Sequence, residues 1–473
     1  MDSVSLARYR RTDLLRNIGL VLKFLERRWQ PGWVPGVLGS ILGVVWGWGS
    51  WQPVEGLNLG SVDIRPDWES AWVRTAITSD PAADSLVSGY LNGLSTNGYL
   101  TGDQGVWVAV GPYTVAQHQG SVRRPAASLT KIATSLAALS TWGPEYRFET
   151  LVGWQGQLEN GVVIGDLVIE GGYDPLFVWE EAIALGNTLQ QMGIRQVTGN
   201  LVIAGGFTMN FDASQSASGQ MLKQAMNAAA WDYAAQSAYE SMPPGTPQPQ
   251  IQIDGEVVSD PSSAKNRVSG WLVRHDSMPL VAVLKAMNIY SNNAMAEQIA
   301  SSLGGLAAVV RQVEAATDLP PEELSLINGS GLGEGNQMSP RAAVVMLQKM
   351  QDELRSQGFT LSDIFPVVGA DGGTVTDRNI PNNAVVKTGT LAVVSALAGA
   401  VPTQQKGIVW FSILNYGSDL NDLRSRQDQV VSAIEQQWGK ATEIPPELKT
   451  TVNIGQAPYQ LGDPQRNQPM YSN

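Results

Sequence analysis

The chain reads Pro-Ala-Ala-Ser-Leu-Thr-Lys at residues 125–131, and this stretch opens a predicted helix over 126–139 in which apolar residues recur at helical spacing. Residues three apart on a helix are neighbours, so the Ser128 hydroxyl and the Lys131 amine can meet. An ordinary serine cap is the simpler interpretation. A cap, however, prefers Glu or Gln three residues later, and a cation in the first turn opposes the helix dipole. We therefore predict a functional serine at a helix start, where free N–H groups favour an oxyanion, with a lysine that can act as base.

A second polar group follows the apolar periodic stretch 280–289, inside a helix predicted over 280–303. It reads Ser291-Asn292-Asn293. A hydroxyl and a carboxamide two residues apart can face one pocket, where the hydroxyl relays a proton and the amide holds a carbonyl. Taken alone, this group is more often a polar helix cap.

A third group, Lys387-Thr388-Gly389-Thr390, follows a strand-like run at 383–386. A lysine in a strand supplies a fixed positive field, and a threonine hydroxyl can bind a carboxylate. Gly389 removes bulk, so that a substrate backbone can pair along the strand edge. Taken alone, this lysine is the kind that protects an edge strand from unwanted pairing.

The three groups are specific when they are taken together and in order. Ser128 and Ser291 are 163 residues apart, and Lys387 follows 96 residues later. This is the S-x-x-K, S-x-N and K-T-G set of acyl-transfer enzymes, in which a serine is the nucleophile.

Around these groups, the pattern predicts helices and strands in alternation. Strands at 385–390, 394–401 and 408–414 form an antiparallel meander, followed by a helix over 419–438. A loose tail rich in Pro, Gln and Asn is expected after Pro445. The other predicted elements are helices at 81–99, 180–192, 219–239 and 339–357, strands at 106–110 and 113–117, short strands within 151–207, and a Pro-rich connector at 243–250.

The N-terminus differs in charge from the rest of the chain. Residues 1–30 carry seven Lys and Arg against three acidic residues, a net +4, which leaves −16 for the remainder. Residues 29–54 contain no charge, and five tryptophans bracket the run 34–50. The positive-inside rule then predicts a membrane anchor with the body outside the cytoplasm; a cleaved signal peptide is the alternative, and a buried core helix fits the glycines and prolines poorly.

Composition excludes several classes of function. The chain of 473 residues has no cysteine and two histidines, so thiolate nucleophiles and multi-histidine metal sites are unavailable. A net charge of −12 argues against nucleic-acid binding. Neither a G-x-S-x-G elbow nor a phosphate-binding loop is present. We therefore expect no cofactor and no metal.

Residues 85–440 resemble the low-molecular-mass, class C type penicillin-binding proteins of the D-alanyl-D-alanine carboxypeptidase/endopeptidase family. The resemblance implies an α+β fold, a five-stranded antiparallel sheet flanked by helices, with an inserted smaller α/β region. It divides the chain into an anchor or signal (1–55), a split catalytic domain (56–152 and 271–442), an insertion (153–270) and a flexible tail (443–473). The similar blocks are 125–131, 275–280, 290–298 (YSNNAMAEQ), 328–336 (NGSGLGEGN), 365–378 and 386–398.

The resemblance also implies residue roles. Ser128 is the nucleophile and Lys131 its base, while Ser291 and Asn293 move protons and hold the substrate. Lys387 and Thr388 bind the terminal carboxylate along the strand that includes Gly389. The backbone N–H groups of Ser128 and Thr390 form the oxyanion hole.

The implied substrates are peptidoglycan stem peptides ending in D-Ala-D-Ala, and β-lactam antibiotics are the implied inhibitors. The implied location is the periplasm, on the outer side of the cytoplasmic membrane. A β-lactamase or esterase on the same scaffold is an alternative, although the E-x-x-L-N segment of class A lactamases is missing. A non-catalytic wall-binding relative is a second alternative.

Two positions depart from several relatives. Ala204, in LVIAGGF, stands about where those relatives carry an Asp, and Glu334 follows Ser-Gly-Leu-Gly where they carry an Arg. In those relatives, the Asp and the Arg recognise a diaminopimelate side chain. We therefore expect poor selectivity for that side chain, and a buried Glu334 would repel the substrate carboxylate.

Overall fold

The computed structural model describes residues 79–471. Within that part, no helix combines the length and the apolar character needed to cross a membrane. The anchor or signal predicted near residues 34–50, and the basic residues before it, lie outside the described residues.

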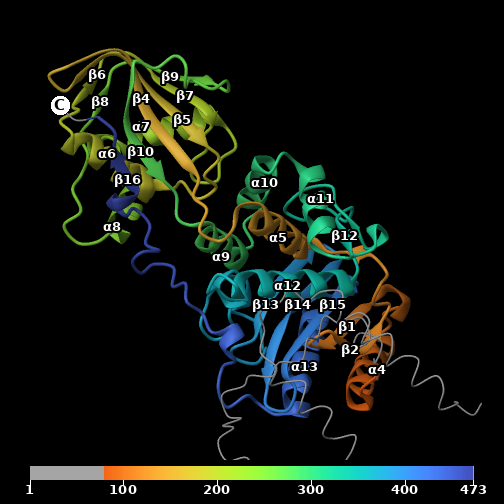
Figure 1. Cartoon of the computed structure of the whole chain (residues 1–473). Coiled ribbons are helices and arrows are strands. Elements are labelled where there is room, and N and C mark those ends of the chain that lie inside the picture. The colour runs from red at the N-terminus through yellow and green to blue at the C-terminus, as the bar shows by residue number, and fades with distance from the viewer. Residues whose placement is uncertain (1–78, 472–473) are drawn as a thin grey trace, which may run out of the picture. The chain divides into compact units, whose positions relative to one another are not determined.

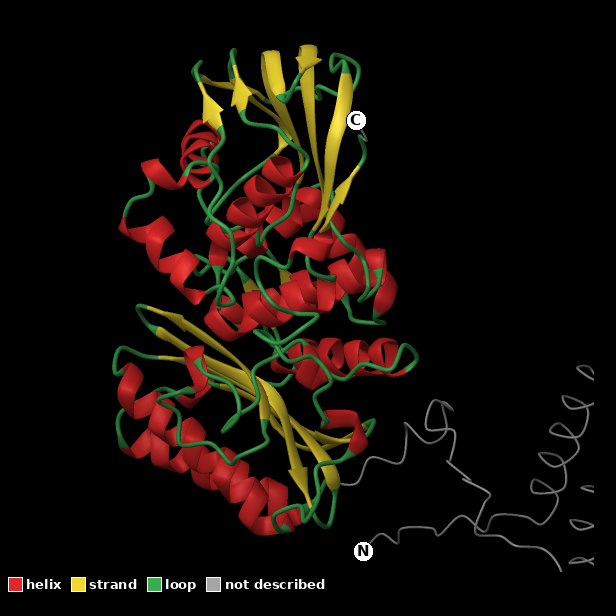
Figure 2. Ribbon diagram, turned by 90° about the vertical axis from the view of Figure 1, so that its left-hand side faces the viewer, coloured by secondary structure: helices red, strands yellow, loops and turns green. Residues whose placement is uncertain are grey.

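A five-stranded antiparallel sheet forms the base of the catalytic region, as predicted (Figure 1). Its second strand, β14, has no residue exposed to solvent, because helices cover both faces of the sheet (Figure 2). Side chains alternate along the strand, so that Ala396 and Ala398 face one helical layer and Leu397 and Val401 face the other. The strands, in spatial order, are β13 (Val385–Leu391), β14 (Val394–Thr403), β15 (Gly407–Tyr416), β1 (Gly105–Val110) and β2 (Tyr113–His118).

One face of this sheet packs against the two helices nearest the ends of the described chain, α4 (Pro81–Thr96) and α13 (Leu420–Trp438). The other face packs against α12 (Pro340–Arg355), and α5 (Thr130–Trp142) packs against α12. The active-site motifs lie on this second side, because α5 follows directly after Ser128.

The single helix predicted over 280–303 is wrong. It is two helices, α9 (Leu280–Tyr290) and α10 (Asn293–Ser302), followed by α11 (Leu306–Ala316). Ser291 takes a left-handed conformation with φ 53° and ends α9, and the Asn292 side chain accepts a hydrogen bond from the Met295 N–H to begin α10. The break therefore falls inside the second motif, where local caps override a continuous apolar period.

The inserted region is built around a second sheet, which has eight strands. Three helices accompany it: α6 (Trp179–Gln191), α7 (Gln215–Ala225) and α8 (Tyr233–Ser241). The single helix predicted over 219–239 is wrong, because Asn227 and Asp232 each cap a new segment within it. The strands are β4 (Glu149–Glu159), β5 (Val162–Gly172), β6 (Gln196–Val197), β7 (Leu201–Gly206), β8 (Gln252–Ile253), β9 (Val257–Asp260), β10 (Gly270–Asp276) and β16 (Asn467–Pro469).

Short elements complete the described part of the chain. A small sheet joins β3 (Arg124–Pro125), β12 (Gln337–Met338) and β11 (Leu324–Ser325). Single 3-10 turns occupy Thr101–Asp103, Ala127–Leu129, Ala228–Ala230, Pro321–Glu323, Leu361–Asp363, Gly373–Val375, Pro446–Leu448 and Pro464–Arg466.

The C-terminal tail is ordered, which corrects the expectation of a loose segment after Pro445. The fully buried carboxylate of Asp363 accepts hydrogen bonds from the N–H groups of Thr451 and Val452. Further along, Arg466 forms a buried ion pair with Glu181, and β16 pairs with β10 of the second sheet. The composition of the tail predicted disorder, because it does not show that a few single polar residues bind partners far away in the chain.

Replacement of Asp363 by Ala should loosen the tail and lower the free energy of unfolding by about 2–4 kcal/mol, because buried N–H groups lose a charged acceptor. Denaturant unfolding measures the loss, and limited proteolysis should show earlier cleavage beyond residue 445. The matched control is Asp352→Ala, which removes an exposed carboxylate paired with Arg355 and should cost below about 0.5 kcal/mol. Equal stability of the two variants would contradict the anchoring role of Asp363.

Candidate active site

The three sequence motifs meet at two lysine side chains. Lys131 Nζ lies 3.2 Å from Ser128 Oγ and 2.8 Å from Asn293 Oδ1. Lys387 Nζ lies 3.0 Å from Ser291 Oγ. The structure thus brings together side chains from the start of α5, the α9–α10 junction and strand β13, as the spacing of the motifs predicts.

The backbone at Ser128 is set by close packing on both sides. Ala127 takes a left-handed conformation with φ 48°, in the 3-10 turn that precedes α5. Gly331 comes so near that a Cβ there would overlap the Ala127 carbonyl oxygen, and a Cβ at Gly389 would lie 2.8 Å from the Ala126 carbonyl oxygen. Strained positions of this kind persist only where surrounding packing enforces them. The result is a half-buried Ser128 side chain, reachable from solvent, on a rigid turn.

The left-handed conformation of Ser291 has a similar effect. It ends α9 and turns the Ser291 hydroxyl toward Lys387, while Asn293, in the first turn of α10, reaches Lys131. Asn292, between them, caps α10 and contributes no contact to either lysine that the structure records in residues 79–471. Within this motif, Asn292 therefore caps a helix, while Ser291 and Asn293 each contact one of the two lysines.

Both lysines are fully buried, and burial dominates their electrostatics. Burial lowers the pKa of Lys131 to about 8, although the nearby carboxylate of Glu297 acts in the opposite direction. The pKa of Lys387 is lowered well below its usual range, first by burial and then by repulsion from Lys131. A proton is therefore easily removed from this pair, which is the property that a lysine base requires.

Two residues that position Lys131, Ser330 and Glu297, were not predicted from the sequence. The Ser330 carbonyl oxygen accepts a hydrogen bond from Lys131 Nζ at 2.7 Å. The Glu297 carboxylate in turn accepts the N–H groups of Gly329 and Ser330, at 3.1 and 2.9 Å, and so fixes that loop. The sequence could have indicated Glu297, because it lies four residues after Asn293 and therefore on the same face of α10.

Successive side chains of the Lys-Thr-Gly-Thr run point to alternate sides of strand β13. Lys387 and Gly389 face Ser291 and the Ala126–Ala127 turn, respectively. Thr388 and Thr390 therefore point to the opposite side of the strand, Thr388 nearly buried and Thr390 exposed.

The two departures from the family pattern lie in different surroundings. Ala204 is fully buried on β7 in a small apolar cluster with Val168 and Ala264. Glu334 is exposed, and its charge raises the pKa of Tyr416. The expectation that Glu334 is buried is therefore wrong, and solvent screens its charge.

Residues 79–471 contain no group of three or more His, Asp or Glu side chains arranged to hold a metal ion. His275, on β10 of the eight-stranded sheet, lies in a buried polar cluster. His275 Nδ1 lies 2.7 Å from Asn467 Oδ1, and Asp174 and Glu181 lie within 4 Å of Nε2. Burial lowers the pKa of His275, but these carboxylates outweigh it and raise the pKa overall.

Known proteins share both the sequence pattern and the fold. The chain is 22% identical over 415 residues to D-alanyl-D-alanine carboxypeptidase DacB of Haemophilus influenzae, covering 66% of this chain and 84% of that protein. It is 33% identical over 164 residues to a D-alanyl-D-alanine carboxypeptidase of an Actinomadura species, covering 31% of this chain and 30% of that one.

Two solved structures are similar in fold. A predatory endopeptidase from Bdellovibrio bacteriovorus, in complex with an immunity protein, aligns with a TM-score of 0.62 at 21% identity, covering 72% of this chain and 96% of that one. Penicillin binding protein 4 from Haemophilus influenzae aligns with a TM-score of 0.56 at 19% identity, covering 74% and 99%.

The D-Ala-D-Ala carboxypeptidase 3 (S13) family model matches residues 106–228 and 218–437, which include all three motifs and most of the two larger sheets, though not β16. The resemblance seen in the sequence is therefore confirmed over most of the chain. With this match, the chain belongs to the D-Ala-D-Ala carboxypeptidase 3 (S13) family.

Proposed function

We propose that the protein is a serine-type D-Ala-D-Ala carboxypeptidase/endopeptidase that cleaves peptidoglycan stem peptides through an acyl-enzyme on Ser128. The observation that carries this proposal is the contact between Lys131 Nζ and Ser128 Oγ, in surroundings that lower the pKa of the lysine to about 8. At pH 7 about a tenth of such a lysine is unprotonated, compared with well under a thousandth of an ordinary one.

In acylation, unprotonated Lys131 takes the Ser128 proton as Oγ attacks the carbonyl carbon of the penultimate D-Ala. The N–H groups of Ser128 and Thr390 receive the oxyanion, where preorganised donors act most strongly. The C–N bond then breaks. Ser291, which contacts Lys387, passes its proton to the departing amine and is reprotonated by the proton that Lys131 took from Ser128, so the terminal D-Ala leaves and Lys131 is unprotonated again. Water later attacks the ester with Lys131 again as base, and Ser128 recovers its proton.

Substrate binding uses the edge of β13. Lys387 and Thr388 hold the terminal carboxylate, whose negative charge favours the charged form of Lys387. Asn293 holds a substrate carbonyl and Lys131 together. Gly389 leaves room for the Ala126–Ala127 turn, which holds Ser128 close to the strand.

A β-lactam can enter the same sequence of steps, because its strained amide takes the place of the D-Ala-D-Ala bond and the ring opening leaves an ester on Ser128. A Bdellovibrio bacteriovorus endopeptidase of the same fold has been solved with penicillin G attached. We propose the same acylation for this chain, which makes β-lactams its inhibitors and useful probes.

Replacing Ser128 by Ala should abolish covalent labelling by benzylpenicillin, and Lys131→Arg should slow it by about 10²–10⁴-fold, because arginine keeps the charge but does not give up its proton. Intact-mass measurement over time gives both results. Lys349→Arg, the same change at an exposed lysine, should acylate at the wild-type rate. An adduct on Ser128→Ala would show that another residue is the nucleophile.

The pH dependence of acylation should follow Lys131. Because the base acts when unprotonated, the second-order rate constant should rise with pH and level off above an inflection near pH 8. Glu297 stabilises the charged lysine, so Glu297→Gln should move that inflection to lower pH. Glu314→Gln, at an exposed acid on α11, should leave it in place. A shift to higher pH in Glu297→Gln would contradict the electrostatic role given to this carboxylate.

We also propose that the catalytic region lies outside the cytoplasmic membrane, held or exported by the N-terminal segment near residues 34–50. The basic head and the uncharged run that follows it support this location. Full-length protein in the membrane fraction, with its body open to protease from outside, is the expected result. A soluble chain beginning near residue 50 would instead support a cleaved signal, and a cytoplasmic chain would contradict the proposal.

A further inference from the structure

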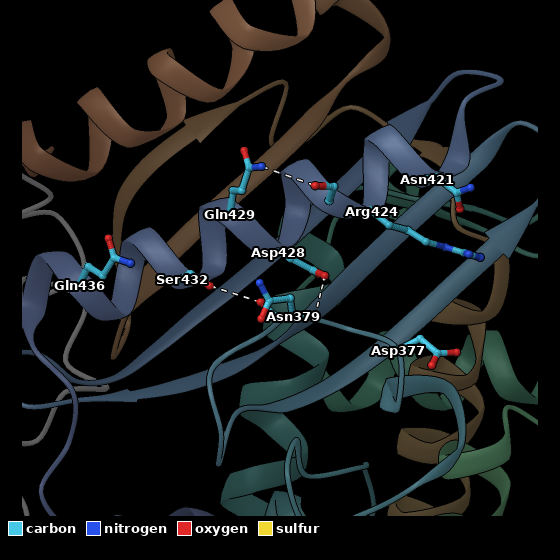
Figure 3. Close-up of a pocket in the computed structure, with 9 residues that line it drawn as sticks. Asp377, Asn379, Asn421, Arg424, Asp428, Gln429, Ser432 and Gln436 are labelled. Carbon is cyan, nitrogen blue, oxygen red and sulfur yellow. Dashed lines mark hydrogen bonds between the residues drawn. The ribbon is translucent and has the colours of Figure 1, made fainter.

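A polar groove of about 840 Å³ runs along the C-terminal helix α13 (Figure 3). One wall is α13 itself, and the other is the loop that contains Asp377 and Asn379. A smaller hollow of about 490 Å³ continues the groove at the start of α13, because Asn421 and Arg424 line both. The groove lies outside the three motifs, and none of the steps at Ser128 uses it.

The side chains that α13 places in the groove are mostly polar and uncharged. They follow one another at intervals of three or four residues, so they lie on one face of the helix over a length of about 22 Å. Two carboxylates of the same helix are neutralised by arginines, since Asp422 pairs with Arg426 at 2.8 Å and Asp428 pairs with Arg378 at 2.6 Å. The uncharged residues are Asn421, Ser425, Gln429, Ser432 and Gln436.

The loop wall of the groove is held to the helix by polar contacts. The Asn379 N–H donates a hydrogen bond to Asp428 Oδ2 at 2.8 Å, and the Ser432 hydroxyl donates one to the Asn379 carbonyl oxygen at 3.4 Å. Arg378 Nε donates another to Asp428 Oδ1 at 2.8 Å. Asn379 and Gln436 are exposed, so their side-chain amides face solvent along a groove that is already formed.

The chemistry of the lining indicates a ligand with many hydroxyl groups and no net charge. A carboxamide both donates and accepts hydrogen bonds, and so does a serine hydroxyl, which matches the hydroxyl and N-acetyl groups of a polysaccharide. Arg424 and Asp377 add one charge of each sign, and these cancel. A stem peptide carries several carboxylates and would require a cationic groove. The glycan chain is therefore the part of peptidoglycan that fits.

The groove begins at the substrate-binding strand. Arg424 Nη2 donates a hydrogen bond to Thr390 Oγ1 at 3.0 Å, so the groove meets β13 at the end of the Lys-Thr-Gly-Thr run. The loop wall begins beside the second motif, because Gly373 packs so closely that a Cβ there would lie 2.3 Å from the Ile289 carbonyl oxygen. In the proposed mechanism Ser291 protonates the departing amine, which places the groove on the leaving-group side.

The size of the leaving group distinguishes two reactions. A carboxypeptidase releases free D-Ala, which is too small to extend along α13. An endopeptidase releases the amine of a second peptide, which is attached to a glycan chain of its own. We propose, on the basis of the proposed function, that the groove along α13 binds the glycan chain of the strand that carries the leaving amine. The groove is then a binding site for cross-linked peptidoglycan, and free stem peptides do not use it.

The test measures the cleavage of two cross-linked substrates and the acylation of Ser128 by benzylpenicillin. The substrates are a D-Ala-linked peptide dimer without sugars, and the same dimer still attached to its glycan chains. The triple variant Asn421→Ala, Gln429→Ala, Gln436→Ala removes three exposed amides from one helix. Gln437→Ala is the control, because Gln437 is exposed next to Gln436 but does not line the groove.

In the triple variant, kcat/KM for the glycan-bound dimer should fall by about 10–100-fold, because the hydrogen bonds of three amides are lost. Cleavage of the sugar-free dimer and acylation by benzylpenicillin should change by less than about threefold, and Gln437→Ala should change no rate by more than that. An equal loss on both dimers, or no loss on either, would overturn the assignment of the groove to the glycan chain.

A binding measurement makes the inference independent of catalysis. Peptide-free glycan chains should bind the wild-type protein in a calorimetric titration, and they should bind the triple variant at least about tenfold more weakly. Equal binding by the two proteins, or no binding by the wild type, would overturn the inference. If benzylpenicillin does not acylate the wild type while the glycan chains still bind, the proposed function is wrong and the glycan site remains.

Discussion

Two lysine side chains without solvent exposure lie at the centre of this protein, and the rest of the site depends on making that burial possible. An ammonium group out of water needs an acceptor for each proton. Lys131 finds oxygens of a serine, an asparagine and a backbone carbonyl, and Lys387 finds a hydroxyl and a carbonyl. Those oxygens come from four separate segments of the chain. Because the two buried lysines need hydrogen-bond acceptors, they hold together the start of α5, the α9–α10 junction, the loop at Ser330 and strand β13.

Helix α10 connects this site to the inserted region. Its first turn carries Asn293, its second turn carries Glu297, and the next residue, Gln298, contacts the insertion. Gln298 accepts a hydrogen bond from Thr208 at 2.6 Å and donates one to the Asp174 carbonyl at 3.2 Å. The C-terminal tail makes a second connection, from Asp363 to the strand that joins the eight-stranded sheet. The insertion is therefore attached to the catalytic region by specific polar contacts as well as by its two chain crossings.

The sequence by itself determined the chemistry and much of the fold. The motifs at Ser128, Ser291 and Lys387 are short, ordered and local, so they can be read without coordinates, and all three meet in the structure. The antiparallel meander and the closing helix were predicted because alternation of apolar residues and helical periods are local properties. The errors occurred where a single capping residue interrupted a long apolar period, as at Asn292 and Asp232.

Tertiary structure alone decided which polar residues support the motifs. Glu297, which fixes the loop behind Lys131, and Asp363, which anchors the tail, lie outside the three motifs, and each binds a partner more than thirty residues away in the chain. Neither the ordered structure of the tail nor the exposure of Glu334 could be predicted from composition or from the family pattern. The physical reason is common to all of these. Burial and charge pairing depend on which segments fold together, and a linear pattern records only what each segment does on its own.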